Sequence, residues 1–185
     1  EAFAHKEKPI LLSTGLSTLD EVMQTVAFIQ KVNPAYNDPN MLCVMQCTSM
    51  YPIPDEDANL NVMNTYKNLT GLAVGYSDHT IGMDALKVAV AMGACALEYH
   101  FTDDRDGKEF RDHKVSLTPD EVCDLKQAIV KIVSLKGNGI KLPEASEIEN
   151  NHQISFRRAV YLNRDIGRGE VIKSSDLVYL RPAHG

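Results

Sequence analysis

The sequence predicts an α/β fold that forms half of a β/α barrel, followed by the start of a smaller second domain. Up to Gly137, short apolar strands alternate with amphipathic helices, which is typical of a parallel sheet covered by helices. Two strands end in a histidine, and barrel enzymes keep their chemistry at the carboxyl ends of their strands. The sequence after Gly137 is polar and aperiodic, which predicts a linker before the second domain.

Capping and breaking residues set the bounds of the first elements. Thr18 and Glu21 have capping-box spacing at the start of a helix. Tyr51 and the prolines after it break the second strand, Thr80 is a candidate cap for the third helix, and Gly93 ends that helix. The elements expected are strands at 10–15, 42–48 and 72–76, and helices at 19–32, 60–68 and 81–92.

The next elements complete the four strand–helix units and begin the second domain. A fourth strand is expected at 94–99, and Thr118 with Glu121 caps a helix that ends at Gly137. Four such units are half of a β/α barrel. The domains expected are the half-barrel at 1–137, the linker at 138–153, and a second domain at 154–185 with a strand at 158–163, a turn at 165–170 and a short element at 171–177.

His79 and His100 are the strongest functional signal. Each follows a buried strand, and one helix lies between the two strands. Parallel neighbours lie about 4.8 Å apart, so two imidazoles at their carboxyl ends can bind one ion. A single histidine at a strand end is usually a satisfied polar residue. Two histidines at the carboxyl ends of neighbouring parallel strands favour a metal site.

The composition excludes several classes of protein. The chain has 185 residues, of which 44% are hydrophobic and 24% charged, as in folded proteins. A net charge of −6 without a basic stripe argues against nucleic acid as a partner. No apolar run is long enough to span a membrane and no signal peptide is visible, so a cytoplasmic location is the default expectation. The four cysteines have no zinc-like spacing and are interpreted as small buried hydrophobic residues: Cys43, Cys47, Cys95 and Cys123.

Six short motifs follow one another along nearly the whole chain. They are Leu12-Ser-Thr-Gly, Gln46-Cys-Thr-Ser-Met-Tyr-Pro-Ile-Pro, Gly75-Tyr-Ser-Asp-His-Thr-Ile-Gly, Glu98-Tyr-His-Phe-Thr, Arg111-Asp-His-Lys-Val-Ser-Leu-Thr-Pro-Asp-Glu and Leu180-Arg-Pro. In this order they resemble the motifs of the sialic acid synthase family, which includes the N-acetylneuraminate, legionaminic acid and pseudaminic acid synthases. The sequence departs from the family at Arg111, where a proline is usual.

The resemblance implies a (β/α)8 TIM barrel joined to a small β-rich domain of the antifreeze-like, or SAF, type. By this similarity the chain begins at about the fifth strand of the barrel and ends early in the SAF domain. It is therefore expected to be truncated at both ends. The family's lysines for phosphoenolpyruvate and a catalytic glutamate would precede it. Family members are transferases that condense phosphoenolpyruvate with an N-acylated amino sugar to give a nine-carbon sugar acid and phosphate.

The resemblance also implies roles for particular residues. His79 and His100 match the family's metal ligands, with Mn²⁺ expected first and Mg²⁺ as a second possibility. Asp112 matches a catalytic aspartate, and Arg181 an arginine that reaches the active site of the partner subunit in a homodimer. The remaining substrate contacts expected at strand ends are Tyr51, which is also a catalytic candidate, Ser49 and Ser77. Weaker candidates are Ser13 and Thr14, His113 beside Asp112, and Asp78 and Glu98 as residues that orient the histidines.

Two alternatives stay open. One is another phosphoenolpyruvate-dependent synthase of seven- or eight-carbon keto sugar acids, although these lack the domain that begins near Arg158. The other is a non-catalytic fragment that keeps the half-barrel for association. The sequence does not determine which nine-carbon acid is made.

Overall fold

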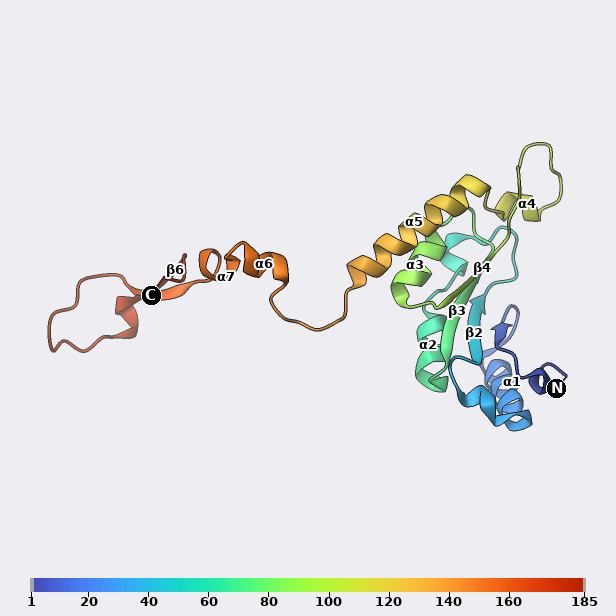
Figure 1. Cartoon of the computed structure of the whole chain (residues 1–185), viewed down its shortest axis with the longest axis horizontal. Helices are drawn as coiled ribbons and strands as arrows, with labels where there is room; N and C mark the ends of the chain where they lie inside the picture. Colours follow the sequence, from blue (N-terminus) through green and yellow to red (C-terminus); the bar gives the residue numbers. More distant parts are fainter. Residues whose placement is uncertain (1, 185) are drawn as a thin grey trace. The chain divides into compact units, whose positions relative to one another are not determined.

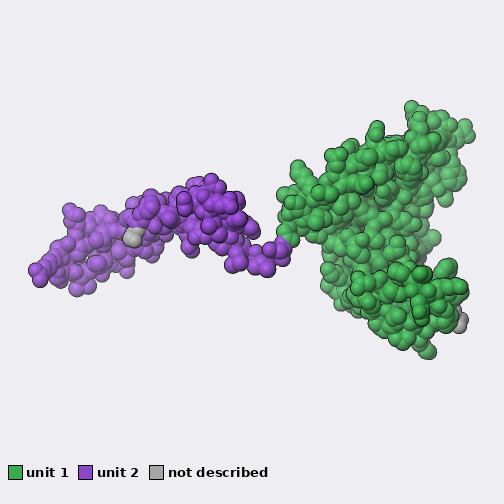
Figure 2. Space-filling view, in the orientation of Figure 1, with its two compact units in different colours: residues 1–137 green, residues 138–185 purple. Residues whose placement is uncertain are grey.

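A computed structural model describes residues 2–184 and divides the chain into two compact units, Glu1–Gly137 and Asn138–Gly185 (Figure 2). The first unit carries four strands in chain order, joined by helices (Figure 1). Its elements are β1 (Ile10–Ser13), α1 (Leu19–Val32), β2 (Leu42–Cys47), α2 (Val62–Thr70), β3 (Ala73–Asp78), α3 (Asp84–Met92), β4 (Ala96–Tyr99), α4 (Asp112–Val115) and α5 (Pro119–Lys136).

The four strands form one parallel sheet in the order β1-β2-β3-β4. Each strand pairs with the next one in the chain, so α1, α2 and α3 each connect two adjacent parallel strands. A parallel bridge between Phe101 and Leu117 extends the sheet beyond β4. The sheet is curled into a half-barrel, which confirms the predicted α/β class and the four strand–helix units.

The core lies between the sheet and its helices. Alternate strand residues face it: Val44, Val74 and Tyr76 are buried in one cluster with Val26 of α1 and Leu86 of α3. Their neighbours in the strands point to the other, concave face, because successive side chains of a strand alternate between faces. The period of the apolar pattern thus decides which residues form the core and which line the barrel interior.

The predicted caps are correct for α1 and wrong for α3. Thr18 and Glu21 form the expected capping box, with the Thr18 N–H donating to Glu21 Oε2 at 2.8 Å. Thr80 does not cap α3, which begins later, at Asp84. Its N–H donates to Asp78 Oδ1 at 2.8 Å and its hydroxyl to Asp78 Oδ2 at 3.1 Å. Gly82, at φ 83°, turns the chain before the helix can begin.

The second unit is small and mostly polar. Its elements are α6 (Ala145–Glu149), α7 (His152–Ser155), β5 (Ala159–Leu162), a 3-10 helix (Ser174–Asp176) and β6 (Leu177–Leu180). The strands β5 and β6 pair antiparallel. The short element expected at 171–177 is therefore the 3-10 helix, and the strand follows it. Among residues 138–184 only Asp176 is buried.

The segment 138–153, expected to be an irregular linker, contains α6 and the start of α7. The Glu144 N–H donates to Glu147 Oε2 at 2.7 Å, which satisfies a donor at the helix start. Ala145 and the glutamates that follow are good helix formers. Because this signal is only one turn long, the periodicity of the sequence did not reveal it.

Candidate functional site

The ends of β3 and β4 bring His79 and His100 together. The ring centroids lie 5.2 Å apart. His79 is buried, and its Nδ1 lies 3.0 Å from the carbonyl oxygen of Thr48, at the end of the neighbouring strand β2. Because a carbonyl only accepts, Nδ1 carries the proton and Nε2 keeps its lone pair. This is the tautomer that a metal ligand needs.

The ring of Tyr51 packs against both histidine rings. Its ring centroid lies 4.0 Å from that of His79 and 5.6 Å from that of His100. The loop that carries it is fixed to the end of β3, because the Ile53 N–H donates to the His79 carbonyl at 2.9 Å. Burial raises the pKa of the Tyr51 hydroxyl, and nearby Cys47 and Asp112 raise it further. The hydroxyl is therefore a proton donor at neutral pH.

Asp112 lies beside His100 from the start of α4. Its Oδ2 is 3.7 Å from His100 Nδ1. Its Oδ1 is buried and has no hydrogen-bond partner among the described residues, although Arg111 Nε lies 3.5 Å away. A buried carboxylate oxygen without a partner is rare and needs an explanation. A ligand bound between Asp112 and the histidines would provide the missing partner.

Arg111, where the family pattern has proline, takes part in the same cluster. Its guanidinium carbon lies 4.8 Å from the centroid of the Tyr51 ring, within the range of a cation–π interaction. It also lowers the pKa of Tyr51, although the groups that raise this pKa outweigh it. Sequence reasoning noted Arg111 only as a departure. Its contact with a ring sixty positions away has no local signal in the sequence.

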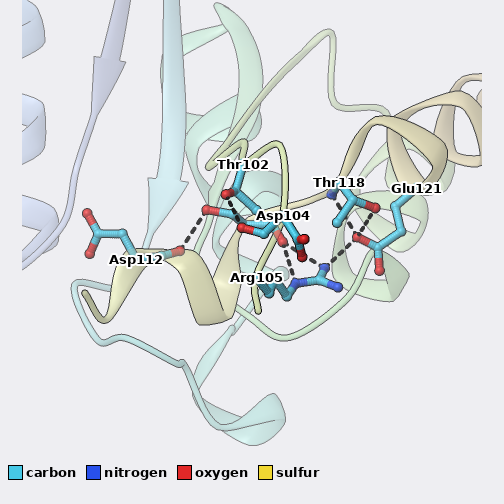
Figure 3. Close-up of polar contacts among 7 residues, drawn as sticks. Thr102, Asp104, Arg105, Asp112, Thr118 and Glu121 are labelled. Atoms are coloured by element: carbon cyan, nitrogen blue, oxygen red, sulfur yellow. Dashed lines mark hydrogen bonds and ion pairs between the residues drawn. The ribbon is translucent and has the colours of Figure 1, made fainter. Parts of the chain in front are cut away.

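The loop before Asp112 is held by the polar contacts shown in Figure 3. Arg105 donates from Nε at 3.0 Å and from Nη2 at 2.7 Å to the Ser116 carbonyl, and its Nη2 also contacts Glu121. Glu121 in turn accepts from the Thr118 N–H at the start of α5. The hydrogen bond from Arg105 is the largest cause of a lowered pKa for Glu121. The charged loop is thus tied to the helix after Asp112.

His113 has a structural role in this loop. Its Nδ1 lies 3.0 Å from Thr102 Oγ1, and that hydroxyl donates to the Asp104 carbonyl at 2.7 Å. Because the hydroxyl has only one proton, His113 Nδ1–H must be the donor to Thr102. The weaker expectation that His113 orients Asp112 is not supported by any hydrogen bond between them among the described residues.

The expected orienting role of Asp78 needs correction, whereas that of Glu98 stays a prediction. Asp78 accepts two hydrogen bonds from Thr80, and the Thr48 carbonyl orients His79 instead. Glu98 is exposed and lines a cavity of about 350 Å³ together with both histidines. No sequence pattern could point to Thr48, because every residue has a carbonyl and only the fold decides which one faces the ring.

The other predicted residues lie apart from this cluster or beside it. Ser77 is buried near the end of β3, two residues before His79. Ser49 lies against Gly15 at the end of β1: a Cβ on Gly15 would be 2.2 Å from Ser49 Oγ. Gly15 therefore leaves room for Ser49. Thr14 is structural, since its hydroxyl donates to the Met45 carbonyl at 2.8 Å.

Arg181 belongs to the second unit, directly after β6. Its guanidinium carbon lies 5.9 Å from the centroid of the Phe156 ring, and Phe156 also packs on His152 at 4.5 Å. The side chain is exposed. Nothing in unit 2 uses the guanidinium as an ion-pair partner within the described residues.

The residues of the cluster fit a divalent ion in part. The two imidazole rings lie with their centroids 5.2 Å apart, one with its tautomer fixed, and Asp112 Oδ1 accepts no hydrogen bond from the described residues, although it lies 3.5 Å from Arg111 Nε. Between residues 2 and 184 no group of three histidine, cysteine, aspartate or glutamate side chains is already gathered around one point. The geometry thus offers two nitrogen ligands with Asp112 next to them, which suits an open site and not a closed structural one.

Comparison with known proteins places these observations in a family. The model of the NeuB family matches residues 1–141. The N,N'-diacetyllegionaminic acid synthase of Legionella pneumophila is 38% identical over 98% of this chain and 50% of its own length. The N-acetylneuraminate-9-phosphate synthase of Mus musculus is 34% identical over 83% of this chain and 41% of its own length.

Solved structures agree. The crystal structure of N-acetylneuraminic acid (sialic acid) synthetase from Leptospira borgpetersenii superposes with a TM-score of 0.72 and 31% identity, over 82% of this chain and 50% of that one. The chain spans about half the length of the curated relatives it matches. No helix within the described part of the chain is both long and apolar enough to cross a membrane.

Proposed function

Since this chain belongs to the NeuB family, we propose that it supplies the metal-binding half of a sialic-acid-type synthase. The protein that carries it condenses phosphoenolpyruvate with the aldehyde of an N-acylated amino sugar, such as N-acetylmannosamine. The products are a nine-carbon sugar acid and phosphate. Its relatives are named as synthases of legionaminic, pseudaminic and sialic acids, which supports a role in making sugar acids.

The observation that carries the proposal is the cluster of His79, His100, Tyr51 and Asp112 at the ends of β3 and β4. The two imidazoles, the tyrosine ring and the carboxylate come from four separate segments and lie close together, and both histidines line one cavity. The Nε2 of His79 and the Oδ1 of Asp112, which accepts no hydrogen bond from the described residues, are both available to a ligand.

We assign His79 and His100 as ligands of a divalent ion, with Mn²⁺ preferred over Mg²⁺ because it accepts nitrogen ligands more readily. When bound, the ion acts as a Lewis acid toward the aldehyde oxygen, which makes the aldehyde carbon a better electrophile. The Thr48 carbonyl holds the His79 ring in the required tautomer and orientation.

The remaining residues position the sugar. Asp112 accepts a hydrogen bond from a sugar hydroxyl at its free Oδ1, and Tyr51, which is protonated at neutral pH, donates one. Arg111 covers the outer face of the Tyr51 ring and keeps it against the histidines. We assign Ser77 and Ser49 to phosphoenolpyruvate, since hydroxyl groups at strand ends can donate to phosphate oxygens without adding charge.

Replacement of either histidine tests the metal site. In the protein that carries this chain, His79→Ala and His100→Ala should each lower phosphate release from phosphoenolpyruvate and N-acetylmannosamine by about a hundredfold or more. Calorimetry should show that Mn²⁺ no longer binds at this site. The matched control is His5→Ala, because His5 is exposed and lies far along the chain from the cluster. Unchanged Mn²⁺ affinity in both single variants would contradict the assignment.

We propose further that the protein is a homodimer in which Arg181 serves the active site of the partner subunit. A guanidinium can donate to an N-acyl carbonyl without a change in protonation. Residues 138–144, which precede α6, could span up to about 25 Å if extended, which gives the second unit freedom to reach a partner subunit. Arg181→Ala should then raise the Michaelis constant for the amino sugar much more than that for phosphoenolpyruvate.

Mixed subunits distinguish action in trans from action in cis. A heterodimer of an Arg181→Ala subunit and a His79→Ala subunit has one site with both defects and one intact site if Arg181 acts in trans. Activity should therefore recover on mixing. If no activity returns although mass measurement confirms the heterodimer, Arg181 acts within its own chain or has no role.

A further inference from the structure

Two cysteine thiols meet on the concave face of the sheet, away from the histidines. Cys43 is in β2, and Cys95 directly precedes β4, with its N–H donating to the Val74 carbonyl at 2.9 Å. Their sulfur atoms lie 3.7 Å apart. Cys43 is buried, whereas Cys95 is exposed in the half-barrel. The sequence predicted that all four cysteines are buried, which is wrong for Cys95 and for Cys123.

The contact crosses a strand, and Gly75 makes it possible. The strands β2 and β4 are not neighbours, because β3 lies between them. A Cβ on Gly75 would lie 3.2 Å from Cys43 Sγ and 2.8 Å from the Ala96 carbonyl oxygen. Any side chain at position 75 would therefore occupy the space through which the two thiols approach each other. A glycine in the middle of a strand weakens it, so its presence here calls for a packing reason.

The thiol pair is separate from the candidate active site. Cys43 pairs in register with Ala73, at the first residue of β3, whereas His79 follows the last residue of the same strand. At about 3.3 Å per residue, the five steps from Val74 to His79 correspond to roughly 16 Å along the strand. A ligand at the thiols would thus not touch the histidines.

The distance between the sulfurs matches a bridging ligand. Two thiolates bonded to one tetrahedral ion at about 2.3 Å each have sulfurs roughly 3.7–3.8 Å apart. We propose that Cys43 and Cys95 form a dithiol site for a thiophilic Lewis acid, namely a d¹⁰ metal ion such as Zn²⁺ or Cd²⁺ or a trivalent arsenical. No third histidine, cysteine, aspartate or glutamate is grouped with them among residues 2–184, so water or the arsenical's own substituent fills the remaining positions.

Burial and the neighbouring thiol raise the pKa of Cys43 to about 12. The thiol is therefore protonated at neutral pH and is a poor nucleophile toward peroxides and disulfides. Thiophilic acceptors differ, because they displace the protons as they bind. For an arsonous acid, R–As(OH)₂ + 2 Cys–SH gives R–As(S–Cys)₂ + 2 H₂O, with no change in oxidation state. Each As–S bond replaces one As–O bond, and each thiol proton leaves in water.

Titration of the full chain with phenylarsine oxide tests the site. We expect one arsenical per chain by intact mass, together with loss of two titratable thiols. Peptide mapping after alkylation should show that Cys43 and Cys95 are the protected residues, and this measurement requires no variant. The adduct should be removed by a dithiol such as dimercaptopropanol and resist an equal concentration of a monothiol.

Variants and a second probe complete the test. Cys95→Ser and Cys43→Ala should each abolish the one-to-one adduct, whereas Cys47→Ser and Cys123→Ser should retain it. The ultraviolet charge-transfer absorption of Cd²⁺ bound to thiolates should disappear in the same two variants, with Cd²⁺ affinity lowered by about tenfold or more. An adduct that maps to Cys47 or Cys123, or that persists in the Cys95→Ser variant, would overturn the proposal.

Discussion

The two units of this chain are stabilised in different ways. In unit 1, aliphatic and aromatic side chains of the strands and helices are buried together in one cluster. In unit 2, every described hydrophobic side chain is at least partly exposed, and the one buried side chain is the carboxylate of Asp176. The comparison teaches that a regular strand–helix pattern can build a core, whereas two short strands depend on polar contacts.

Arg164 is the centre of those contacts. Its Nε donates to Asp176 Oδ1 at 2.7 Å and its Nη2 to Glu170 Oε1 at 2.6 Å. Asp176 Oδ2 also accepts from the Lys173 N–H at 2.8 Å. These bonds close the loop between β5 and β6. We therefore expect the stability of unit 1 to depend mainly on buried apolar side chains and that of unit 2 mainly on charged contacts.

The largest effect should come from the core of unit 1. Leu86 in α3 is fully buried, so Leu86→Ala should lower the free energy of unfolding by about 2–5 kcal/mol, through lost burial and the cavity left behind. The control is Leu162→Ala in β5, a residue that is 46% exposed and should lose less than about 1 kcal/mol. Urea denaturation followed by circular dichroism measures both. Equal losses would contradict the comparison.

A smaller effect, confined to unit 2, should follow from Asp176→Asn. Without the carboxylate charge, Arg164 loses its buried partner, and the amides of β5 and β6 should exchange with solvent about tenfold faster or more. The control Asp165→Asn changes an exposed carboxylate in the same loop. Amide exchange by nuclear magnetic resonance measures both. Unchanged exchange in the Asp176 variant would show that the loop does not depend on this charge.

Acid should reproduce that effect in the native sequence. The hydrogen bond from Arg164 is the largest cause of a lowered pKa for Asp176. A folded-state pKa below the unfolded value means that the interaction stabilises unit 2 above the usual carboxyl range, and that this contribution is lost as pH falls through the lowered pKa. Exchange rates in β5 and β6 should rise over that acidic range. Rates that stay constant there would contradict this sign.

In unit 1, loss of one charge pair should matter less than loss of a core side chain. Glu121→Gln removes the charge that Arg105 contacts, and because both side chains are partly exposed the expected loss is about 1 kcal/mol. The loop from Thr102 to His113 should become more mobile, and Mn²⁺ affinity should change little. Glu109→Gln, at an exposed position in that loop, is the control. A loss as large as that for Leu86→Ala would mean that charged contacts stabilise unit 1 as much as buried side chains do.

The smallest effect should come from a helix cap far from the site. Thr18→Ala removes the side-chain bond at the start of α1 and should lower the free energy of unfolding by about 0.5–1 kcal/mol. The neighbouring Ser17→Ala, which does not cap the helix, should be close to neutral. Thermal unfolding of both variants measures the difference. Equal stabilities would mean that the capping box contributes nothing beyond the packing of α1.

Much of unit 1 could be predicted because its signals are local. The helix 19–32 has the predicted bounds, since its cap and its apolar period lie within the helix itself. The start of α3 could not be predicted from Thr80, because Asp78 competes for the Thr80 donors. In unit 2, α6 was missed because one helical turn is too short to show a period.

The candidate site was partly predictable for the same reason. His79 and His100 follow strands that the apolar pattern marks, and parallel strands bring their ends together. The partners of these histidines were not visible. The Thr48 carbonyl is 31 positions from His79, and no residue type distinguishes one backbone carbonyl from another.

The sequence by itself determined the strand–helix alternation, the caps of α1 and α5, and the family, because period, spacing and motif are properties of neighbouring residues. Only the tertiary structure decided the rest. It set the tautomer of His79, placed Arg111 over Tyr51, left Asp112 Oδ1 without a hydrogen bond from the described residues, and brought the thiols of Cys43 and Cys95 together across Gly75. These contacts join residues that are far apart in the sequence and become neighbours only when the sheet forms. A pattern of neighbouring residues does not predict them.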